Sequence, residues 1–244
     1  MPRQTTLNRS ALTLLLTFAT TACIFAADLE SNDQQTQKAS VPTVQQKNSD
    51  STLRRVLLIG DSISIAYTPL VQTALTGIAE VERVRGNCQF SAHGAEHAGQ
   101  WIADKQWDVI HFNFGLWDLY GWKQDGLISV QDYGANLEKI VTTLQPACEV
   151  LIFATTTPPC AEPEHKIKVL VPPDKAAAFE AEARRVMKKH GVLVNDLDGI
   201  LVGRMDELGK APDDVHYTPE GNRVIADKVA SFIDMSLGLL PENR

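Results

Sequence analysis

The sequence predicts an α/β fold in which helices cover both faces of one five-stranded parallel sheet. The first observation is that five short apolar segments alternate with segments of helical periodicity along most of the 244 residues. This alternation is typical of βαβ units, which build parallel sheets. The second observation is that the strand segments stay apolar instead of alternating with polar residues, as strands buried on both faces do.

The N-terminal residues 1–27 have the pattern of an export signal and are not expected to belong to the fold. Arg3 and Arg9 precede an apolar run over 11–27 that ends in small residues. The run is shorter than the ~20 residues that a bilayer span needs, so we expect no integral membrane segment after cleavage. The prediction is a secreted or periplasmic protein. Lipoprotein anchoring through Cys23 is the alternative, although the preceding "TTA" lacks the aliphatic residue of a lipidation motif.

Residues 28–52 are polar and rich in Gln, Ser and Asn, which predicts a disordered linker between the signal and a folded domain over 53–240. The strands of the domain are predicted at residues 53–60, 78–84, 107–115, 148–156 and 192–197. Its helices are predicted near residues 65–77, 95–104, 130–144 and 174–191, before a last helix with Thr218 as N-cap and Pro219 as first residue.

The composition argues against several classes of function. The formal net charge is -7 at pH 7, and no continuous basic segment indicates nucleic-acid binding. Cys88, Cys148 and Cys160 remain after cleavage, and without a C-x-x-C pair they do not predict a zinc site. If a disulfide forms, Cys88–Cys160 is the better candidate, because both residues follow strands. We expect neither a metal nor a cofactor.

Ser62 is the first candidate catalytic residue. It follows Gly60 and Asp61 at the carboxyl end of the first predicted strand, which is the edge of a parallel sheet where ligands bind. A hydroxyl at this place lies near unpaired helix N–H groups that can stabilise an oxyanion. A serine needs a base to become a nucleophile. Without a base, the segment would be a strand-to-helix turn with Ser62 as its cap.

The base is predicted near the other end of the domain, in "APDDVHYTPEGN" over 211–222. His216 stands two residues before the last helix, and Asp213 precedes it by three residues. In a turn these positions face each other, so the carboxylate of Asp213 would hold the Nδ1–H of His216 and leave Nε2 for Ser62. Asp214 ranks second, because adjacent side chains point in different directions.

The segments "GDSIS" and "DDVH" resemble motifs of the SGNH (GDSL-type) esterase/lipase superfamily, and the resemblance covers residues 54–238. "GDSIS", "GNC", "HFNFGLWDL" and "TTTPP" together are similar to a secreted bacterial subgroup. The resemblance implies a three-layer α/β/α sandwich and the hydrolysis of acyl esters. It also implies that Ser62 is the nucleophile and that Asp213 and His216 complete a triad.

The resemblance also implies an oxyanion hole that combines the N–H of Ser62 with further donors. The family's second motif places a glycine N–H after the second strand, and the segment 85–94 offers Gly86 or Gly94 for it, with Asn87 in the same stretch. The third motif is Gly-x-Asn-Asp, but "GLWD" has Trp117 at the asparagine position. Asn87 or Asn113 would then supply the missing amide. Losing one such donor typically lowers the rate by ~10²–10³.

Asp61, Trp117 and Tyr120 are candidate residues lining the substrate site. For Asp61 the structural alternative is bonding to amides of the serine loop. Trp117, Tyr120 and Trp122 either stack on a sugar or acyl group or form a hydrophobic cap. The proline-rich segment 158–173 is either a lid or substrate wall or a surface excursion. His111 lies inside the third strand and is expected to be a core histidine.

These features predict a secreted serine esterase acting on acylated small molecules or carbohydrates, with short acyl groups and carbohydrate O-acetyl esters favoured. Ser62 would attack the ester carbonyl, and His216 would take its proton and then protonate the leaving alkoxide. Two alternatives stay open. One is a lipase or thioesterase of the same superfamily, and the other is a catalytically weak carbohydrate-binding relative in which Trp117 marks a lost oxyanion hole. Fold alone does not decide among them.

Overall fold

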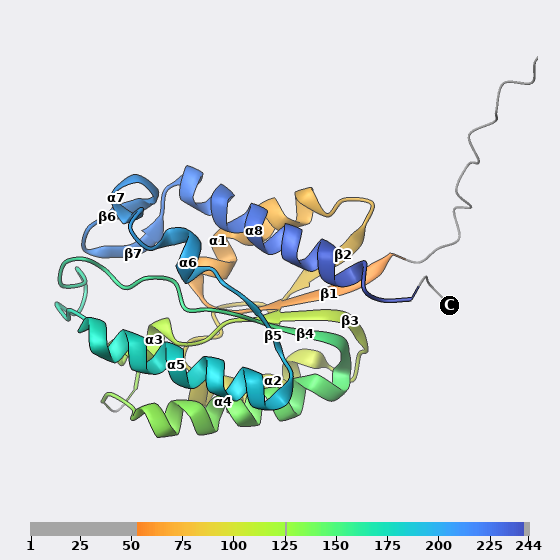
Figure 1. Cartoon of the computed structure of the whole chain (residues 1–244), viewed down its shortest axis with the longest axis horizontal. Helices are drawn as coiled ribbons and strands as arrows, with labels where there is room; N and C mark the ends of the chain where they lie inside the picture. Colours follow the sequence, from red (N-terminus) through yellow and green to blue (C-terminus); the bar gives the residue numbers. More distant parts are fainter. Residues whose placement is uncertain (1–52, 125, 242–244) are drawn as a thin grey trace, which may run out of the picture. The chain divides into compact units, whose positions relative to one another are not determined.

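The predicted five-stranded sheet lies at the centre of the fold (Figure 1). The computed structural model describes residues 53–124 and 126–241, so the predicted signal peptide at 1–27 and the linker at 28–52 lie outside the described residues. Within the described ranges, no helix is both long and apolar enough to cross a bilayer. The strands run in the order β2-β1-β3-β4-β5, and every pair is parallel.

All five predicted strands are present. They are β1 (Arg54–Ile59), β2 (Ala79–Arg83), β3 (Trp107–Phe112), β4 (Cys148–Ala154) and β5 (Leu193–Asn195). In β1, residues 56–59 are at most 3% exposed, because helices cover both faces of the sheet. Burying each of these aliphatic side chains stabilises the fold by roughly 1.5–3 kcal/mol.

The helices form one layer on each face of the sheet (Figure 1). The long helices are α1 (Ser62–Ala74), α2 (Ser91–Ile102), α4 (Val130–Leu144), α5 (Pro173–His190) and α8 (Pro219–Leu237). α1 and α8 pack together on one face, while α2, α4 and α5 cover the other. This arrangement confirms the three-layer α/β/α sandwich. The hydroxyl of Thr218 accepts the N–H of Gly221, which confirms Thr218 as the N-cap of α8.

The remaining elements are short. They are α3 (Leu116–Tyr120), η1 (Gln145–Ala147), α6 (Asp198–Leu201), α7 (Met205–Leu208), β6 (Gly209–Ala211) and β7 (Asp214–Tyr217). β6 and β7 form a separate antiparallel pair. With three and four residues, these two strands are too short to give a periodic pattern, so the sequence did not predict them. They matter because β7 carries His216 toward the sheet edge and leads into α8.

Polar side chains fasten the carboxyl ends of the central strands together. Asn113, which directly follows β3, donates its amide to the carbonyl oxygens of Ala154 at 2.8 Å and Thr155 at 3.2 Å. The hydroxyl of Thr155 accepts the N–H groups of Leu197 and Asp198 at 2.9 and 2.8 Å. These bonds join the segments that follow β3, β4 and β5. The loops that follow β3, β4 and β5 therefore begin at positions that hydrogen bonds hold in place at the carboxyl edge of the sheet.

His111 is buried in β3, as predicted, with 0% of its surface exposed. Asn195 Nδ2 lies 3.2 Å from His111 Nε2. Burial lowers the pKa of His111 from 6.5 to about 4, so the folded protein keeps the imidazole neutral where the unfolded chain takes up a proton. The stability that depends on this histidine is complete above pH 6.5 and is lost as the pH falls toward 4.

We expect this effect to lower the free energy of unfolding by about 2 kcal/mol between pH 7 and pH 5. In His111→Gln this pH-dependent loss should be absent, whatever the change in absolute stability. Urea unfolding at several pH values measures it. Gln131→Ala, at an exposed position of α4, removes no titratable group and is the control that should keep the wild-type pH dependence. An unchanged pH dependence in His111→Gln would show that another group is responsible.

Candidate active site

Ser62 is the first residue of α1 and follows the turn at Gly60 and Asp61. Asp61, and not Ser62, is the N-cap, because its Oδ1 accepts the N–H of Ile63 at 2.9 Å. The Ser62 hydroxyl is therefore not needed for capping, and it lies in the helical turn whose N–H groups have no intrahelical acceptor. A Cβ at position 60 would lie 2.9 Å from Ser64 Oγ, so any larger residue would force the Ser64 side chain to shift.

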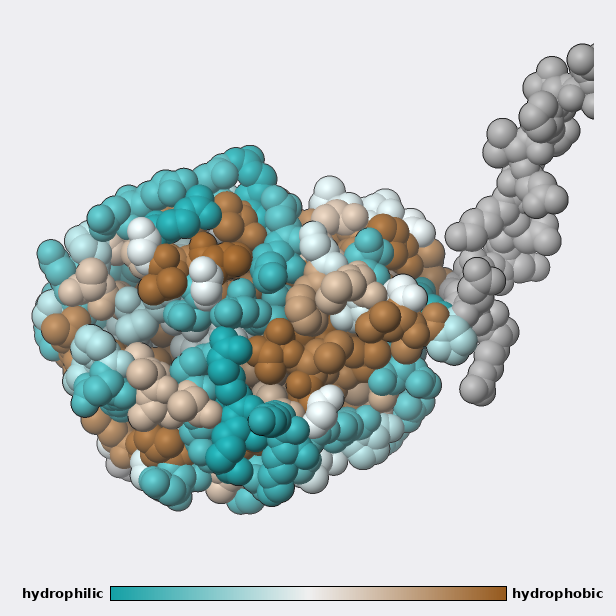
Figure 2. Space-filling model, in the orientation of Figure 1, coloured by the Kyte–Doolittle hydropathy of each residue, from teal (hydrophilic) through white to brown (hydrophobic). Residues whose placement is uncertain are grey.

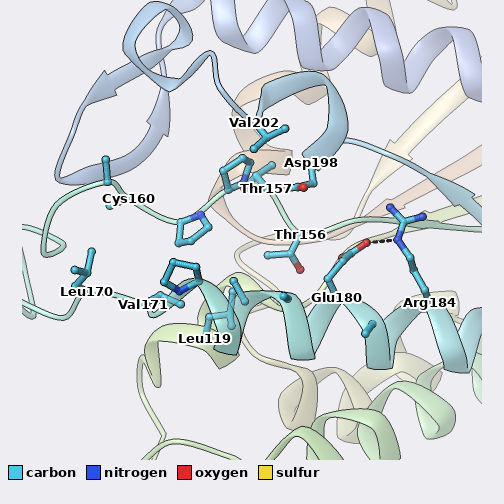
Figure 3. Close-up of a pocket in the computed structure, with 17 residues that line it drawn as sticks. Leu119, Thr156, Thr157, Cys160, Leu170, Val171, Glu180, Arg184, Asp198 and Val202 are labelled. Atoms are coloured by element: carbon cyan, nitrogen blue, oxygen red, sulfur yellow. Dashed lines mark ion pairs between the residues drawn. The ribbon is translucent and has the colours of Figure 1, made fainter.

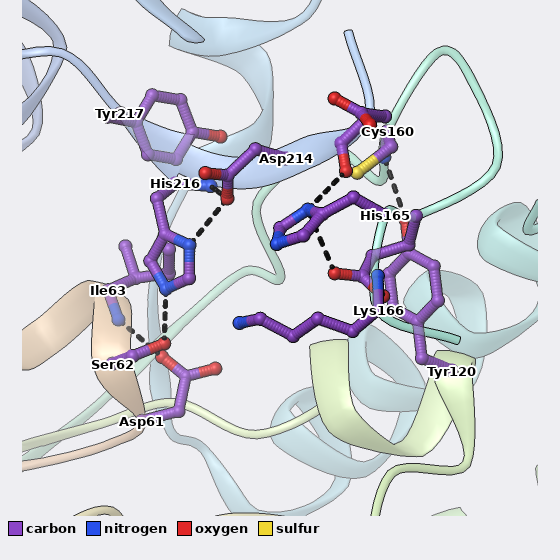
Figure 4. A network of polar contacts seen from close by, with 12 residues as sticks. Asp61, Ser62, Ile63, Tyr120, Cys160, His165, Lys166, Asp214, His216 and Tyr217 are labelled. Atoms are coloured by element: carbon purple, nitrogen blue, oxygen red, sulfur yellow. Dashed lines mark hydrogen bonds and ion pairs between the residues drawn. The ribbon is translucent and has the colours of Figure 1, made fainter. Parts of the chain in front are cut away.

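His216 lies in β7 and reaches Ser62 from the far end of the chain (Figure 4). Its Nε2 lies 3.0 Å from Ser62 Oγ, within the reach of a general base. Side chains alternate along β7, so Val215 and Tyr217 are buried on one side while Asp214 and His216 share the other. The structure thus brings the predicted pair of Ser62 and His216 together.

The carboxylate that contacts His216 belongs to Asp214, and the prediction of Asp213 for this place is wrong. Asp214 Oδ1 lies 2.6 Å from His216 Nδ1 and also accepts the N–H of His216 at 2.9 Å. The prediction assumed a turn, whereas the extended backbone of β7 places residues i and i+2 on one side. Asp213 instead contributes its main-chain oxygen, which accepts the N–H of His165 at 3.0 Å.

The contacts with His216 keep Asp214 ionised. Partial burial raises the pKa of Asp214, but the N–H and the imidazole of His216 lower it more, so that it lies below its ordinary value of 3.8. An ionised Asp214 favours the imidazole tautomer that carries its proton on Nδ1. His216 Nε2 is then the acceptor for the Ser62 hydroxyl.

Arg83, at the end of β2, holds the loops around Ser62, although the sequence analysis did not single it out. Its guanidinium donates to the carbonyl oxygens of Gly60 at 2.8 Å and Gly86 at 2.7 Å. The sequence feature that could have identified Arg83 is its position at the carboxyl end of a predicted strand, at the same sheet edge as the Gly-Asp-Ser turn. Asp61 is only 4% exposed and bonds to the loop. It therefore has the structural role given as its alternative and does not line the substrate site.

The structure distinguishes between the expected oxyanion donors. Asn113 is ruled out, because its amide already donates to two carbonyl oxygens at the end of β4. Asn87 Oδ1 accepts the N–H of Gln89 at 2.8 Å, which orients the side chain, and Asn87 Nδ2 donates to no other described residue. Gly86 has a φ of +82°, a conformation that favours glycine. The donors that stay available are the N–H groups of Ser62 and Gly86 and the amide of Asn87.

Tyr120 does not line the site, so this prediction is wrong. The side chain is 3% exposed, and its hydroxyl accepts the N–H of Cys160 at 2.8 Å, which fastens the loop 158–173. The Tyr120 ring stacks on Trp122 with 4.6 Å between centroids. Trp122 meets Trp117 edge-on at 5.5 Å. The hydrophobic-cap alternative therefore holds for Tyr120, whereas Trp117 lies at the cavity beside Ser62.

A cavity of about 300 Å³ opens beside the Ser62–His216 pair. Its lining consists of Ser62, Trp117, Trp122, Lys123, Lys166, Ile167 and His216. The sequence analysis did not single out Lys123, Lys166 and Ile167. Lys166 and Ile167 belong to the proline-rich loop 158–173. The position of this loop after the fourth strand could have indicated that its residues line the site. That loop forms one wall of the cavity.

A larger cavity, of about 750 Å³, is also lined by residues of the loop 158–173 (Figure 3). It is lined by residues 156–161 and by part of α5, where Glu180 pairs with Arg184 at 2.6 Å. Neither Ser62 nor His216 lines it. The candidate active site is therefore the smaller cavity.

The cysteines offer no competing nucleophile. Cys88, Cys148 and Cys160 are all free, so the candidate Cys88–Cys160 disulfide is not formed. Burial raises the pKa of each of these thiols, and that of Cys88 reaches about 11. Protonated thiols are poor nucleophiles at neutral pH. Across the described part of the chain, no group of three or more His, Cys, Asp or Glu side chains is placed to hold a metal.

Comparisons with solved structures agree with this architecture. A lipase/acylhydrolase from Enterococcus faecalis is 20% identical, with a TM-score of 0.63, over 79% of this chain and 100% of that chain. An acetyl xylan esterase is 18% identical, with a TM-score of 0.61, over 73% of this chain and 99% of that chain. A psychrotrophic esterase from Pseudoalteromonas sp. is 14% identical, with a TM-score of 0.61, over 76% and 99%. At these identities the likeness shows the fold.

The sequence also matches a protein family. No curated protein matches the chain. The matched family is described as the GDSL-like Lipase/Acylhydrolase family, and the match extends over residues 58–224. This range includes the turn at Ser62, the strand that carries His216 and the start of α8. The chain belongs to the GDSL-like lipase/acylhydrolase family of ester hydrolases.

Proposed function

We propose that this chain is a secreted serine esterase in which Ser62, His216 and Asp214 act as a catalytic triad. The observation that carries the proposal is a chain of two contacts. His216 Nε2 lies 3.0 Å from Ser62 Oγ, and His216 Nδ1 lies 2.6 Å from Asp214 Oδ1. In this geometry a histidine can take the proton of the hydroxyl while the carboxylate stabilises the resulting imidazolium.

The reaction proceeds through an acyl-enzyme. Ser62 Oγ attacks the ester carbonyl carbon while its proton passes to His216 Nε2. The N–H groups of Ser62 and Gly86 and the amide of Asn87 donate to the oxyanion of the tetrahedral intermediate. The bond to the leaving group breaks, and His216 protonates the departing alkoxide. His216 then deprotonates a water molecule, which attacks the acyl-enzyme, releases the carboxylic acid and restores Ser62.

Short acyl esters of carbohydrates are the substrates that the site favours. The cavity at Ser62 has a volume of about 300 Å³, and Trp117 and Trp122 line it with aromatic surface on which a sugar ring can pack. Figure 2 shows several hydrophobic patches of different size between hydrophilic residues on one face, the largest at the centre right. One structure of the same fold is an acetyl xylan esterase. These features support carbohydrate O-acetyl esters over long-chain lipids.

Secretion is supported by the sequence. Arg3 and Arg9 followed by the apolar run over 11–27 give the export signal, and 28–52 give a polar linker to the domain. The exported form would be secreted or periplasmic, with lipidation at Cys23 as the alternative anchor.

A carbohydrate-binding relative with weak catalysis is the second candidate. Trp117 occupies the position of the family's asparagine, and the amide of Asn113 is already bound to carbonyl oxygens. If Asn87 does not reach the oxyanion, the expected loss is about 10²–10³ in rate.

The chain without residues 1–27 should hydrolyse 4-nitrophenyl acetate and butyrate faster than the decanoate and palmitate esters. An aryl phosphonate should inactivate it with one equivalent bound, and peptide mass spectrometry should place the adduct on Ser62. A preference for long chains would instead favour the lipase alternative. A folded protein with no turnover and no adduct would favour the carbohydrate-binding relative.

A further inference from the structure

Two lysines stand beside the candidate nucleophile. Lys123 and Lys166 both line the cavity that holds Ser62 and His216. Figure 4 shows the side chain of Lys166 extending toward these two residues. Lys123 Nζ lies 5.6 Å from the centroid of the Trp117 ring, on the same cavity wall as this indole. The cavity therefore presents two ammonium groups next to aromatic surface.

The backbone that carries Lys166 is fixed in place. The carboxylate of Glu164 is 1% exposed and accepts the N–H groups of Lys166 at 2.9 Å and Ile167 at 3.0 Å. The N–H of His165 donates to the carbonyl oxygen of Asp213 at 3.0 Å. These contacts tie the loop to the segment that bears the catalytic histidine. Lys166 is therefore held at the cavity with little backbone freedom to lose on binding.

The lining of the cavity includes two lysines and no carboxylate. Neither lysine forms an ion pair with a described carboxylate. The nearby carboxylates of Asp61, Asp214 and Glu164 lie outside the lining and are directed to other groups. Asp61 accepts the N–H of Ile63, Asp214 contacts His216, and Glu164 accepts the N–H groups of Lys166 and Ile167. The whole chain has a formal charge of -7. A positively charged cavity in an acidic protein attracts anions that the remaining surface repels.

We propose that this site selects acyl esters in which an anionic group, a carboxylate or a sulfate, lies beside the scissile bond. An O-acetylated acidic sugar unit fits this description. Its ring would pack on Trp117 and Trp122, and its anionic group would lie between Lys123 and Lys166. The inference rests on the proposed esterase function and specifies its substrate class. Lysine suits this role, because its ammonium is a compact charge that remains hydrated at an open site.

Matched aryl esters test the proposal. The neutral probe is methyl 5-acetoxy-2-nitrobenzoate, and the anionic probes are 5-acetoxy-2-nitrobenzoate and 5-acetoxy-2-nitrobenzenesulfonate. Each kcat/KM is divided by the rate of spontaneous hydrolysis of the same ester, which corrects for reactivity. We expect an anionic preference of about tenfold at low salt, from two exposed ion pairs. It should fall as ionic strength rises. The carboxylate and the sulfonate distinguish the two kinds of anion.

Substitutions of the two lysines test whether they cause the preference for anionic esters. In the double variant Lys123→Gln and Lys166→Gln the ratio of anionic to neutral kcat/KM should fall to about one, whereas Lys188→Gln, on the exposed side of α5, should leave the ratio unchanged. Acetate release from acetylated polygalacturonate and from acetyl xylan extends the comparison to sugars. Equal corrected rates on the neutral and anionic probes would overturn the proposal, and so would a double variant that keeps the preference.

A binding measurement separates this inference from the esterase proposal. Ser62→Ala should bind acetylated oligogalacturonate more tightly than acetylated xylo-oligosaccharide, and the two lysine substitutions should remove the difference. If the wild type hydrolyses no ester but Ser62→Ala still binds the anionic oligosaccharide more tightly, the esterase proposal is refuted and the anion-binding site is supported. If esters are hydrolysed without any preference in rate or binding, the esterase function stands and the anion site fails.

Discussion

Ser62→Ala is expected to lower kcat for 4-nitrophenyl acetate by a factor of about 10⁵–10⁶, because the chain loses the only hydroxyl in contact with His216 Nε2 among the described residues. His216→Ala should cause a loss of similar size. Because the two groups act as a unit, the double variant should be little worse than either single variant. Steady-state kinetics at neutral pH with the purified chain measures all three.

The matched control for this experiment is Ser231→Ala. Ser231 is an exposed serine of α8 and should keep full activity. Thermal unfolding and circular dichroism show whether each variant is folded. Retention of most activity in a folded Ser62→Ala protein would refute the assignment of the nucleophile.

Asp214→Asn is expected to lower kcat by about 10³–10⁴, whereas Asp213→Asn should change it by less than about threefold. An asparagine at position 214 can hold His216 in the wrong tautomer, and it does not stabilise the imidazolium. Asp213→Asn keeps the main-chain oxygen that accepts the N–H of His165. Asparagine and aspartate side chains have nearly the same shape, so each substitution mainly removes the negative charge. The two variants therefore show which of the two adjacent carboxylates acts on His216.

The pH profile adds a second readout for Asp214. Contacts with His216 hold the pKa of Asp214 below its ordinary value, so this carboxylate stays ionised throughout the mildly acidic range. The acidic limb of the activity profile should therefore not come from protonation of Asp214. A large loss in Asp213→Asn with normal activity in Asp214→Asn would reverse the assignment.

The sequence was sufficient to predict the sheet, its helices and the meeting of Ser62 with His216. Strand order and the carboxyl-edge rule bring these two residues together whatever the details of the loops. The choice between Asp213 and Asp214 depended on whether the segment was a turn or a strand. The four residues of β7 are too few to show period-two alternation in the sequence.

The other misplaced residues depended on contacts between distant segments. Asn113 appeared available because nothing in its own loop shows that carbonyl oxygens of β4 and the following loop lie within 3.2 Å of its amide. Tyr120 appeared exposed because its partner, the N–H of Cys160, is 40 residues away. Lys166 was overlooked because its loop forms a cavity wall only through contacts with a distant segment, such as the bond from the N–H of His165 to the carbonyl oxygen of Asp213. Such contacts leave no local pattern in the chain.

The packing of α8 on α1 has a consequence for the time at which the protein becomes active. Ser62 and His216 are 154 residues apart, and they are carried by the elements at opposite ends of the domain. α8 follows β7 directly and packs against α1. A ribosome that has completed the whole sheet has therefore still produced an inert chain. We expect hydrolysis to begin only when β7 and α8 have been made and have packed beside α1, so a chain that is incomplete or still being exported is inactive.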